Sequence, residues 1–391
     1  MKVVFTLGSA LIGGGTNVIL EHASKMKELG EDVYIVTEKK VKSIDYSWHS
    51  KAHKLKWITL KEAKSMNFDI AIGTWWATIY YLYKINAKKY LYFVQSIESR
   101  FYSNNEEGLK LYAEMTYLMG LKVITEATWI KEYLESKYNN EVILVRNGIR
   151  KDVFTLDGEK YPECDGLRVL VEGPIDVPFK NVPKTIKLVR KSKASEIWLL
   201  TSSNVNKYPG VDKVFSRVPV KDCAKIYRSC DVIVKLSYVE GMFGPPLEMF
   251  HTGGTAIVYD VTGHDEYIVN GYNGIVIKTD DEDQVVESIN KLLDKKLLTK
   301  YKSNAIKTAE EWIDWDTSSK QFYDAVKKYA NEDSVSQIDL EVKANFYQNI
   351  YEMYENKSTS LKRKIGDFGR QKFPKLYKLY YKLVSKKYYK R

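Results

Sequence analysis

KVVFTLGSALIGGGTNVILEHASKMKELGEDVYIVT, residues 2–37, contains the pattern that decides the fold. Its apolar start predicts a buried strand, and the glycines that follow predict a tight loop. Residues 17–29 then repeat apolar side chains at helical spacing, and EDVYIVT reads as a second strand. A strand, a helix and a strand in this order form a βαβ unit, which is the building block of a parallel sheet.

The same alternation continues along the chain. Further apolar runs occur at FDIAIGT, KYLYFVQ, LKVIT and EVILVRNG, mostly with helix-like stretches between them. The pattern breaks at residues 157–166 and restarts with LRVLVEG, SEIWLLTSS, DVIVKLS, TAIVYDV and GIVIK. We therefore expect an α/β protein of two doubly wound parallel-sheet domains, which would bind ligands at the carboxyl ends of their strands.

The amino-acid composition argues against several classes of protein. A chain of 391 residues with 44% apolar content is long enough for two buried cores. Cys164, Cys223 and Cys230 show neither a CxxC spacing nor paired histidines, so we expect no zinc site and no disulfide framework, as in a reducing cytoplasm. No stretch approaches the roughly 18 uninterrupted apolar residues of a membrane-spanning helix.

The positive charge is concentrated at the end of the chain. The net charge is +11, but residues 357–391, the basic tail, hold 13 lysines and arginines against one acid, Asp367. The rest of the chain is nearly neutral, which argues against a nucleic-acid-binding protein. On a helix the tail would place lysines on one side and Leu376, Tyr380 and Leu383 on the other, a pattern that favours attachment to an anionic membrane surface. A solvated terminus, a nucleic-acid arm and a protein partner remain as alternatives.

Two acids flank a glycine- and proline-rich turn in YVEGMFGPPLEMFHTGG, residues 238–254. Pro245 and Pro246 suit the first turn of a helix, which places Glu248 inside that helix and Glu240 in the loop before it. Carboxylates accept hydrogen bonds from sugar hydroxyls, and glycine amides at a helix start attract a diphosphate. A nucleotide sugar would fit. The alternatives are a glycosidase acid pair and a purely structural role.

Other motifs are less specific. GGGT, Gly13 to Thr16, could hold a phosphate at a helix start or simply join strand to helix. DWD, Asp314 to Asp316, resembles a metal motif, but its helical setting favours a structural role. We expect Asp265 and Glu266 to cap a following helix.

Several stretches resemble the retaining family-4 glycosyltransferases of GT-B fold. EGMFGPPLE keeps the E-x7-E spacing of that family, and the likeness extends to GGGTNVILEHASKMKELGEDVYIVT, VRNGIRKDVF and VEGPIDVPFKN, covering roughly residues 1–330. YFVQSIESRFY stands where many members carry a functional histidine. In this respect the chain is similar to a bacterial subgroup that includes rhamnosyltransferases.

The resemblance implies roles for individual residues. Glu240 would hold hydroxyls of the donor sugar, Glu248 the ribose, and Lys180 the diphosphate, while Pro174 stands where an arginine is often found. Glu240 and Lys180 would be the catalytic residues. The further donor-binding candidates are Gly241, Met242, Phe243, Gly244, Gly14 and Gly15. Gln95, Glu98 and Trp75 would lie on the acceptor side, although the aromatic residues around Trp75 would equally suit a core.

The resemblance further implies transfer of a hexosyl or deoxyhexosyl unit, with retention and without a metal ion, to a saccharide or lipid-linked acceptor in surface polysaccharide or glycolipid synthesis. The expected domains are an acceptor-binding domain at 1–156, a donor domain at 157–310, a helix crossing back at 311–330 and a helical extension with the basic tail at 331–391. The protein would be cytoplasmic and peripheral on the inner face of the membrane. A non-catalytic nucleotide-sugar-binding subunit is the alternative, and homo-oligomer formation stays open.

Overall fold

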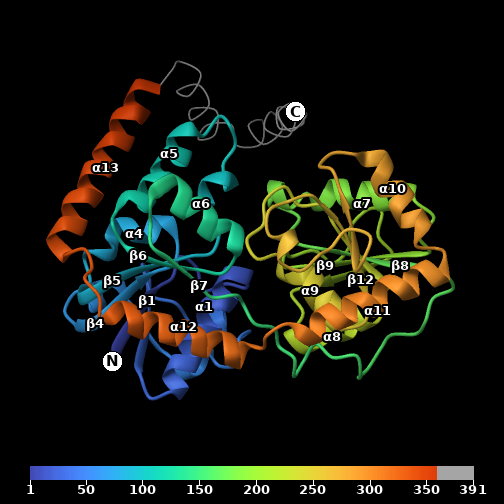
Figure 1. Ribbon diagram of the computed structural model, residues 1–391, viewed down its shortest axis with the longest axis horizontal. Helices are drawn as coiled ribbons and strands as arrows, with labels where there is room; N and C mark the ends of the chain where they lie inside the picture. Colours follow the sequence, from blue (N-terminus) through green and yellow to red (C-terminus); the bar gives the residue numbers. More distant parts are fainter. Residues whose placement is uncertain (359–391) are drawn as a thin grey trace.

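A computed structural model describes residues 1–358, with side chains as far as Glu355, as two α/β domains that lie side by side (Figure 1). The basic tail, residues 357–391, which is predicted to bind an anionic membrane surface, lies outside the described residues, apart from the helical backbone at 357 and 358. Within this described part of the chain, no helix is long and apolar enough to cross a bilayer.

The first domain contains a seven-stranded parallel sheet of order β3-β2-β1-β4-β5-β6-β7. Its strands are β1 (Lys2–Thr6), β2 (Asp32–Thr37), β3 (Lys56–Thr59), β4 (Asn67–Gly73), β5 (Asn86–Val94), β6 (Lys122–Thr125) and β7 (Val142–Leu144). The carboxyl-terminal halves of the inner strands β4 and β5 are fully buried because helices cover both faces.

The second domain contains a six-stranded parallel sheet of order β10-β9-β8-β11-β12-β13. Its strands are β8 (Arg168–Glu172), β9 (Glu196–Thr201), β10 (Lys213–Ser216), β11 (Val232–Lys235), β12 (Thr255–Tyr259) and β13 (Gly274–Ile277). The two doubly wound parallel sheets expected from the sequence are therefore confirmed.

Helices cover both sheets (Figure 1). Those of the first domain are α1 (Gly14–Glu28), α2 (Ser43–Tyr46), α3 (Leu60–Ala63), α4 (Trp76–Leu82), α5 (Glu107–Met115) and α6 (Thr128–Tyr138). The others are α7 (Val182–Lys191), α8 (Val220–Arg228), α9 (Gly244–His251), α10 (Glu282–Lys291), α11 (Lys295–Glu311), α12 (Trp315–Ala330) and α13 (Gln337–Ser358).

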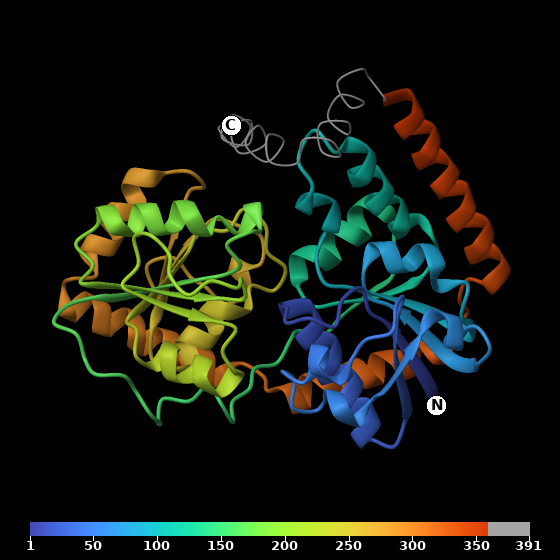
Figure 2. The same cartoon turned by 180° about the vertical axis from the view of Figure 1, so that it is seen from behind.

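The chain returns to the first domain after α11, and α12 packs against α1 (Figure 2). The segment between α11 and α12 is hydrogen-bonded to the segment that joins the two sheets. The Ile149 N–H donates to the Ile313 carbonyl at 3.2 Å. On α12, Phe322 stacks on His22 of α1 with ring centroids 4.2 Å apart. The chain passes between the domains twice, after β7 and after α11. The carboxyl ends of the central strands of both sheets lie near each other, since Gly241 after β11 lies against Gln95 after β5.

Candidate functional site

A cluster of charged side chains lies where the central strands of the second sheet end. Lys180, in the turn after β8, donates to Glu240 Oε2 across 2.8 Å. Lys235, the last residue of β11, lies 2.6 Å from Glu172 Oε2 and 3.7 Å from Glu240 Oε1. Lys235 is 3% exposed and Glu240 is 6% exposed.

The two lysines keep Glu240 ionised. Burial alone would raise the pKa of Glu240, but the charges of Lys180 and Lys235 hold it below its ordinary value. Glu240 Oε1 makes no well-aligned hydrogen bond, with the Ser237 hydroxyl and the Lys235 ammonium as its neighbours. A buried acceptor without a donor costs about 1–3 kcal/mol, so this oxygen is suited to accept a hydroxyl from a ligand.

Glu248 lies one turn into α9 and differs from Glu240 in charge. Burial, and then repulsion by Glu172, raise the pKa of Glu248 to about 8, while a hydrogen bond from Tyr227 acts in the opposite direction. The carboxyl group is therefore largely protonated at neutral pH. It can donate one hydrogen bond as well as accept others, which suits a vicinal diol.

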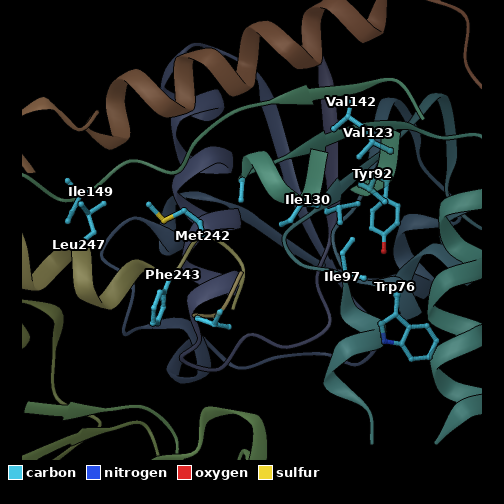
Figure 3. Close-up of a cluster of buried hydrophobic side chains, with 14 of the residues drawn as sticks. Trp76, Tyr92, Ile97, Val123, Ile130, Val142, Ile149, Met242, Phe243 and Leu247 are labelled. Carbon is cyan, nitrogen blue, oxygen red and sulfur yellow. The ribbon is translucent and has the colours of Figure 1, made fainter. Parts of the chain in front are cut away.

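The donor loop, Gly241–Gly244, connects the two acids and packs against the first domain. A Cβ added at Gly241 would lie 2.4 Å from the Gln95 carbonyl oxygen, so only glycine fits there. Met242 and Phe243 are 4% and 2% exposed and belong to a buried apolar cluster that continues into the first domain (Figure 3). Their side chains pack in this cluster, so any contact of these two residues with a donor would come from the backbone, and their donor-binding role stays a prediction. Gly244, in contrast, has open space around its Cα.

Three of the first-domain candidates lie together at the start of α1. A Cβ added at Gly15 would lie 3.1 Å from Gln95 Oε1, whereas Gly14 has open space. Gln95 Oε1 is buried and has no hydrogen-bond partner. The Gln95 carbonyl also lies against Gly241. Gln95 therefore contacts both the start of α1 in the first domain and the donor loop of the second domain.

Trp75 and Glu98, the other two candidates for the acceptor side, differ in their surroundings. The Trp75 ring stacks on Phe101, which stacks on Phe179 of the second domain with ring centroids 4.9 Å apart. Glu98 is 3% exposed and accepts a 2.7 Å hydrogen bond from the Trp76 amide at the start of α4. Burial raises the pKa of Glu98 to about 8. Glu98 is therefore enclosed in the first domain, and its place on the acceptor side stays a prediction.

The weaker motifs have structural partners. Asp314 caps α12 by accepting from the Thr317 amide, and Asp316 pairs with Lys25 and Lys320. Glu266 does not cap a helix that follows it, as the sequence had suggested, because the chain forms only a short 3-10 turn there.

Glu266 instead reaches the first domain. Its carboxylate accepts from the Thr128 amide and hydroxyl, and it pairs with Arg146 at 3.0 Å. In the described residues no three histidine, cysteine, aspartate or glutamate side chains gather as metal ligands. That transfer needs no metal stays a prediction.

The sequence patterns did not predict Lys235 or Glu126. Lys235 interrupts the apolar run DVIVKLS, and a lysine inside a buried strand is a signal, because lysine is almost never fully buried unless it is paired. Glu126 directly follows β6, at the carboxyl edge where ligands bind. It is 6% exposed and contacts the donor loop through the Met242 amide.

Comparison of sequences gives a family match within the second domain. Residues 211–312, which include both acids of the candidate site, match the family described as Glycosyl transferases group 1. The chain is 22% identical over 211 residues to Uncharacterized glycosyltransferase MJ1178 of Methanocaldococcus jannaschii, with 50% of this chain and 56% of that protein covered. It is 24% identical over 168 residues to Uncharacterized glycosyltransferase MJ1069 of the same organism, with 42% and 43% covered. The chain spans about half the length of the curated relatives it matches.

Solved structures share the arrangement of both domains. Sucrose-phosphate synthase from Thermosynechococcus elongatus has a TM-score of 0.67 at 14% identity, with 84% of this chain and 99% of that chain covered. Anabaena Alr3699/HepE, solved in complex with UDP-glucose, has a TM-score of 0.68 at 13% identity, with 84% and 100% covered. At these identities the likeness shows the fold, which is the GT-B arrangement of two Rossmann-like domains. The chain therefore has a GT-B fold, and residues 211–312 of its second domain match the group 1 family model.

Proposed function

We propose that this protein is a glycosyltransferase that moves a hexosyl or deoxyhexosyl unit from a nucleoside-diphosphate sugar to a saccharide or lipid-linked acceptor, with retention at the anomeric carbon. One observation carries the proposal. Glu240, a buried carboxylate held by two lysines at the carboxyl ends of the second sheet, keeps Oε1 without a well-aligned hydrogen bond. The group 1 domain around this residue supports the same assignment.

The charged groups would act by positioning and by electrostatic stabilisation. Glu240 Oε1 accepts a hydroxyl of the donor sugar, and the largely neutral Glu248 both donates to and accepts from the ribose diol. Lys180 is only partly buried, so on donor binding it can share its charge between Glu240 and the leaving diphosphate. The leaving phosphate then takes the proton of the acceptor hydroxyl on the same face, so no protein nucleophile is needed.

The acceptor belongs on the first-domain side, near Gln95 and Trp75. The row of stacked rings from Trp75 to Phe179 would give a sugar or lipid-linked acceptor an apolar surface beside Lys180. A peripheral position at the cytoplasmic face of the membrane, a role in surface polysaccharide or glycolipid synthesis and a rhamnosyl donor belong to the same proposal.

Replacing Glu240 with glutamine tests the assignment. The change keeps the shape but removes the charge that Lys180 and Lys235 balance, so transfer should fall by about 100-fold or more. Mass spectrometry of donor hydrolysis across UDP-, dTDP- and GDP-sugars measures the loss without an identified acceptor. An E240Q rate equal to that of the wild type would refute the role of Glu240. Tight binding of a donor without any turnover would indicate a non-catalytic nucleotide-sugar-binding subunit instead.

A further inference from the structure

Glu126 is a buried carboxylate at the boundary between the two domains. Its Oε2 accepts a 2.8 Å hydrogen bond from the Asn147 side chain, which belongs to the first domain. Its Oε1 accepts from the Met242 amide of the second domain at 3.3 Å. None of the described lysines or arginines forms an ion pair with Glu126. The carboxyl group of Glu126 is therefore held only by the dipoles of the Asn147 side chain and the Met242 amide. Its position depends on the geometry of both domains.

The backbone that Glu126 contacts is strained. Phe243 has φ of 58°, in the left-handed region, and directly precedes the first residue of α9. A non-glycine residue in this region costs of order 1–3 kcal/mol unless its surroundings enforce the conformation. The conformation of this residue sets where α9 begins, and through it the placement of Glu248 relative to Glu240.

Hydrogen bonds enforce this conformation at three consecutive residues. The Trp129 indole donates to the Gly241 carbonyl at 3.0 Å, Glu126 accepts from the Met242 amide, and the Tyr267 hydroxyl donates to the Phe243 carbonyl. Trp129 and Glu126 belong to the first domain. Two of the three contacts therefore exist only while the two domains are together.

We propose that Glu126 is a positioning residue for the transfer reaction: acting from the first domain, it fixes the donor loop Gly241–Gly244 and so orients Glu240 and Glu248 when the domains close. This inference rests on the proposed function, because the loop matters for transfer only if the two acids hold the donor. Glu126 itself touches no substrate. Its action passes through the backbone of the loop.

Closure has a predictable dependence on pH. Asn147 faces Glu126 from the loop after β7, Gln95 lies nearby after β5, and Gly241 and Met242 face it from the donor loop, so no charged side chain is among its direct neighbours. Burial raises the pKa of Glu126 to about 7. Separation of the domains exposes the carboxyl group and returns its pKa toward the ordinary value. Closing therefore takes up a proton, and donor affinity should weaken as the pH rises from about 5 through 7.

Two substitutions at Glu126 should affect donor kinetics in different ways. E126A removes the acceptor of the Met242 amide, so kcat/KM for the donor should fall by about 10- to 100-fold, which corresponds to the cost of one buried donor left without a partner. The KM for the acceptor should not change. E126Q keeps an oxygen for the Met242 amide and should retain activity within about 3-fold of the wild type at pH 6.5, but it should lose the fall in donor affinity between pH 5 and 7.

E21Q is a matched control, because Glu21 is also a buried acid of the first domain but pairs with Lys51 away from the donor loop. It should keep both the wild-type kinetics and the wild-type pH dependence. Unchanged kinetics in E126A, or a wild-type pH dependence in E126Q, would overturn the proposal. If E126A does not fold, the pH profile of E126Q decides.

Hydrogen exchange of the ligand-free protein separates this inference from the proposed function. E126A should increase exchange of the Met242 amide and of the start of α9 by at least 10-fold, with no comparable change in α10. If the wild type binds no nucleotide sugar, the proposed function fails, while the exchange result still decides whether Glu126 holds the loop. Unchanged exchange in E126A refutes that role.

Discussion

Replacing Lys235 with methionine tests the charge balance of the candidate site. Lys235 is almost completely buried, 2.6 Å from Glu172 and 3.7 Å from Glu240. Two unit charges at about 4 Å attract by about 4 kcal/mol at an effective dielectric constant of about 20. Removing one partner of a buried pair costs roughly 3–5 kcal/mol, because the other charge stays buried without compensation. K235M should therefore lower the free energy of unfolding by that amount, out of a total of about 5–15 kcal/mol.

A second substitution separates charge from packing. In K235M, the carboxylates of Glu172 and Glu240 face only one lysine, Lys180. K235M combined with E172Q leaves one carboxylate and one lysine, so the double variant should be more stable than K235M by about 1–3 kcal/mol. If the loss came only from the shape of methionine, the double variant would gain nothing.

Urea unfolding followed by tryptophan fluorescence and circular dichroism measures both differences, provided that the m-values agree among the variants. Calorimetry of donor binding adds a second readout, since loss of Lys235 should raise the pKa of Glu240 and weaken donor binding on the acidic side. A K235M protein within about 1 kcal/mol of the wild type would refute the reasoning, as would a double variant no more stable than K235M.

Three further outcomes are expected. G241A should separate the domains, because its Cβ would lie 2.4 Å from the Gln95 carbonyl; small-angle scattering should show a larger radius of gyration than for G244A, whose Cβ meets open space. Wild-type stability should fall as the pH rises from 4.5 toward 8, because the folded state holds an extra proton on Glu98 in this range. E98Q should reduce this slope by about 1.4 kcal/mol per pH unit, measured by urea unfolding at pH 5 and 9, and parallel slopes would contradict it. Deleting residues 357–391 should release the protein from anionic vesicles in a flotation assay, and continued binding would rule out the tail as the anchor.

Two of the thirteen strands in the part of the chain that the structure describes were absent from the strands that the sequence pattern predicted. β3 (Lys56–Thr59) and β10 (Lys213–Ser216) each lie at the edge of their sheet and have at most one fully buried residue. An edge strand is covered on fewer sides, so its sequence does not need the continuous apolar run that marks an inner strand. Inner strands were predictable because burial on both faces leaves a strong pattern.

The local geometry of the donor loop was also predictable from the sequence. Pro245 and Pro246 fix the start of α9, and this places Glu240 before the helix and Glu248 inside it. The pairing of Lys180 with Glu240 brings together two residues that the resemblance had selected as candidates. These features depend on residues close in sequence or on a motif that the family shares.

Only the tertiary structure decided which groups surround that loop. Glu126, Trp129 and Gln95 are far from it in sequence and reach it because parallel strands place all their carboxyl ends at one edge, and two such edges face each other. The same arrangement buries the side chains of Met242 and Phe243, which the resemblance had selected as donor-binding candidates. By itself, the sequence determined the two sheets and the acidic pair, because backbone preference and burial act locally. The charge of each acid and the shape of the loop depend on side chains brought together across the fold.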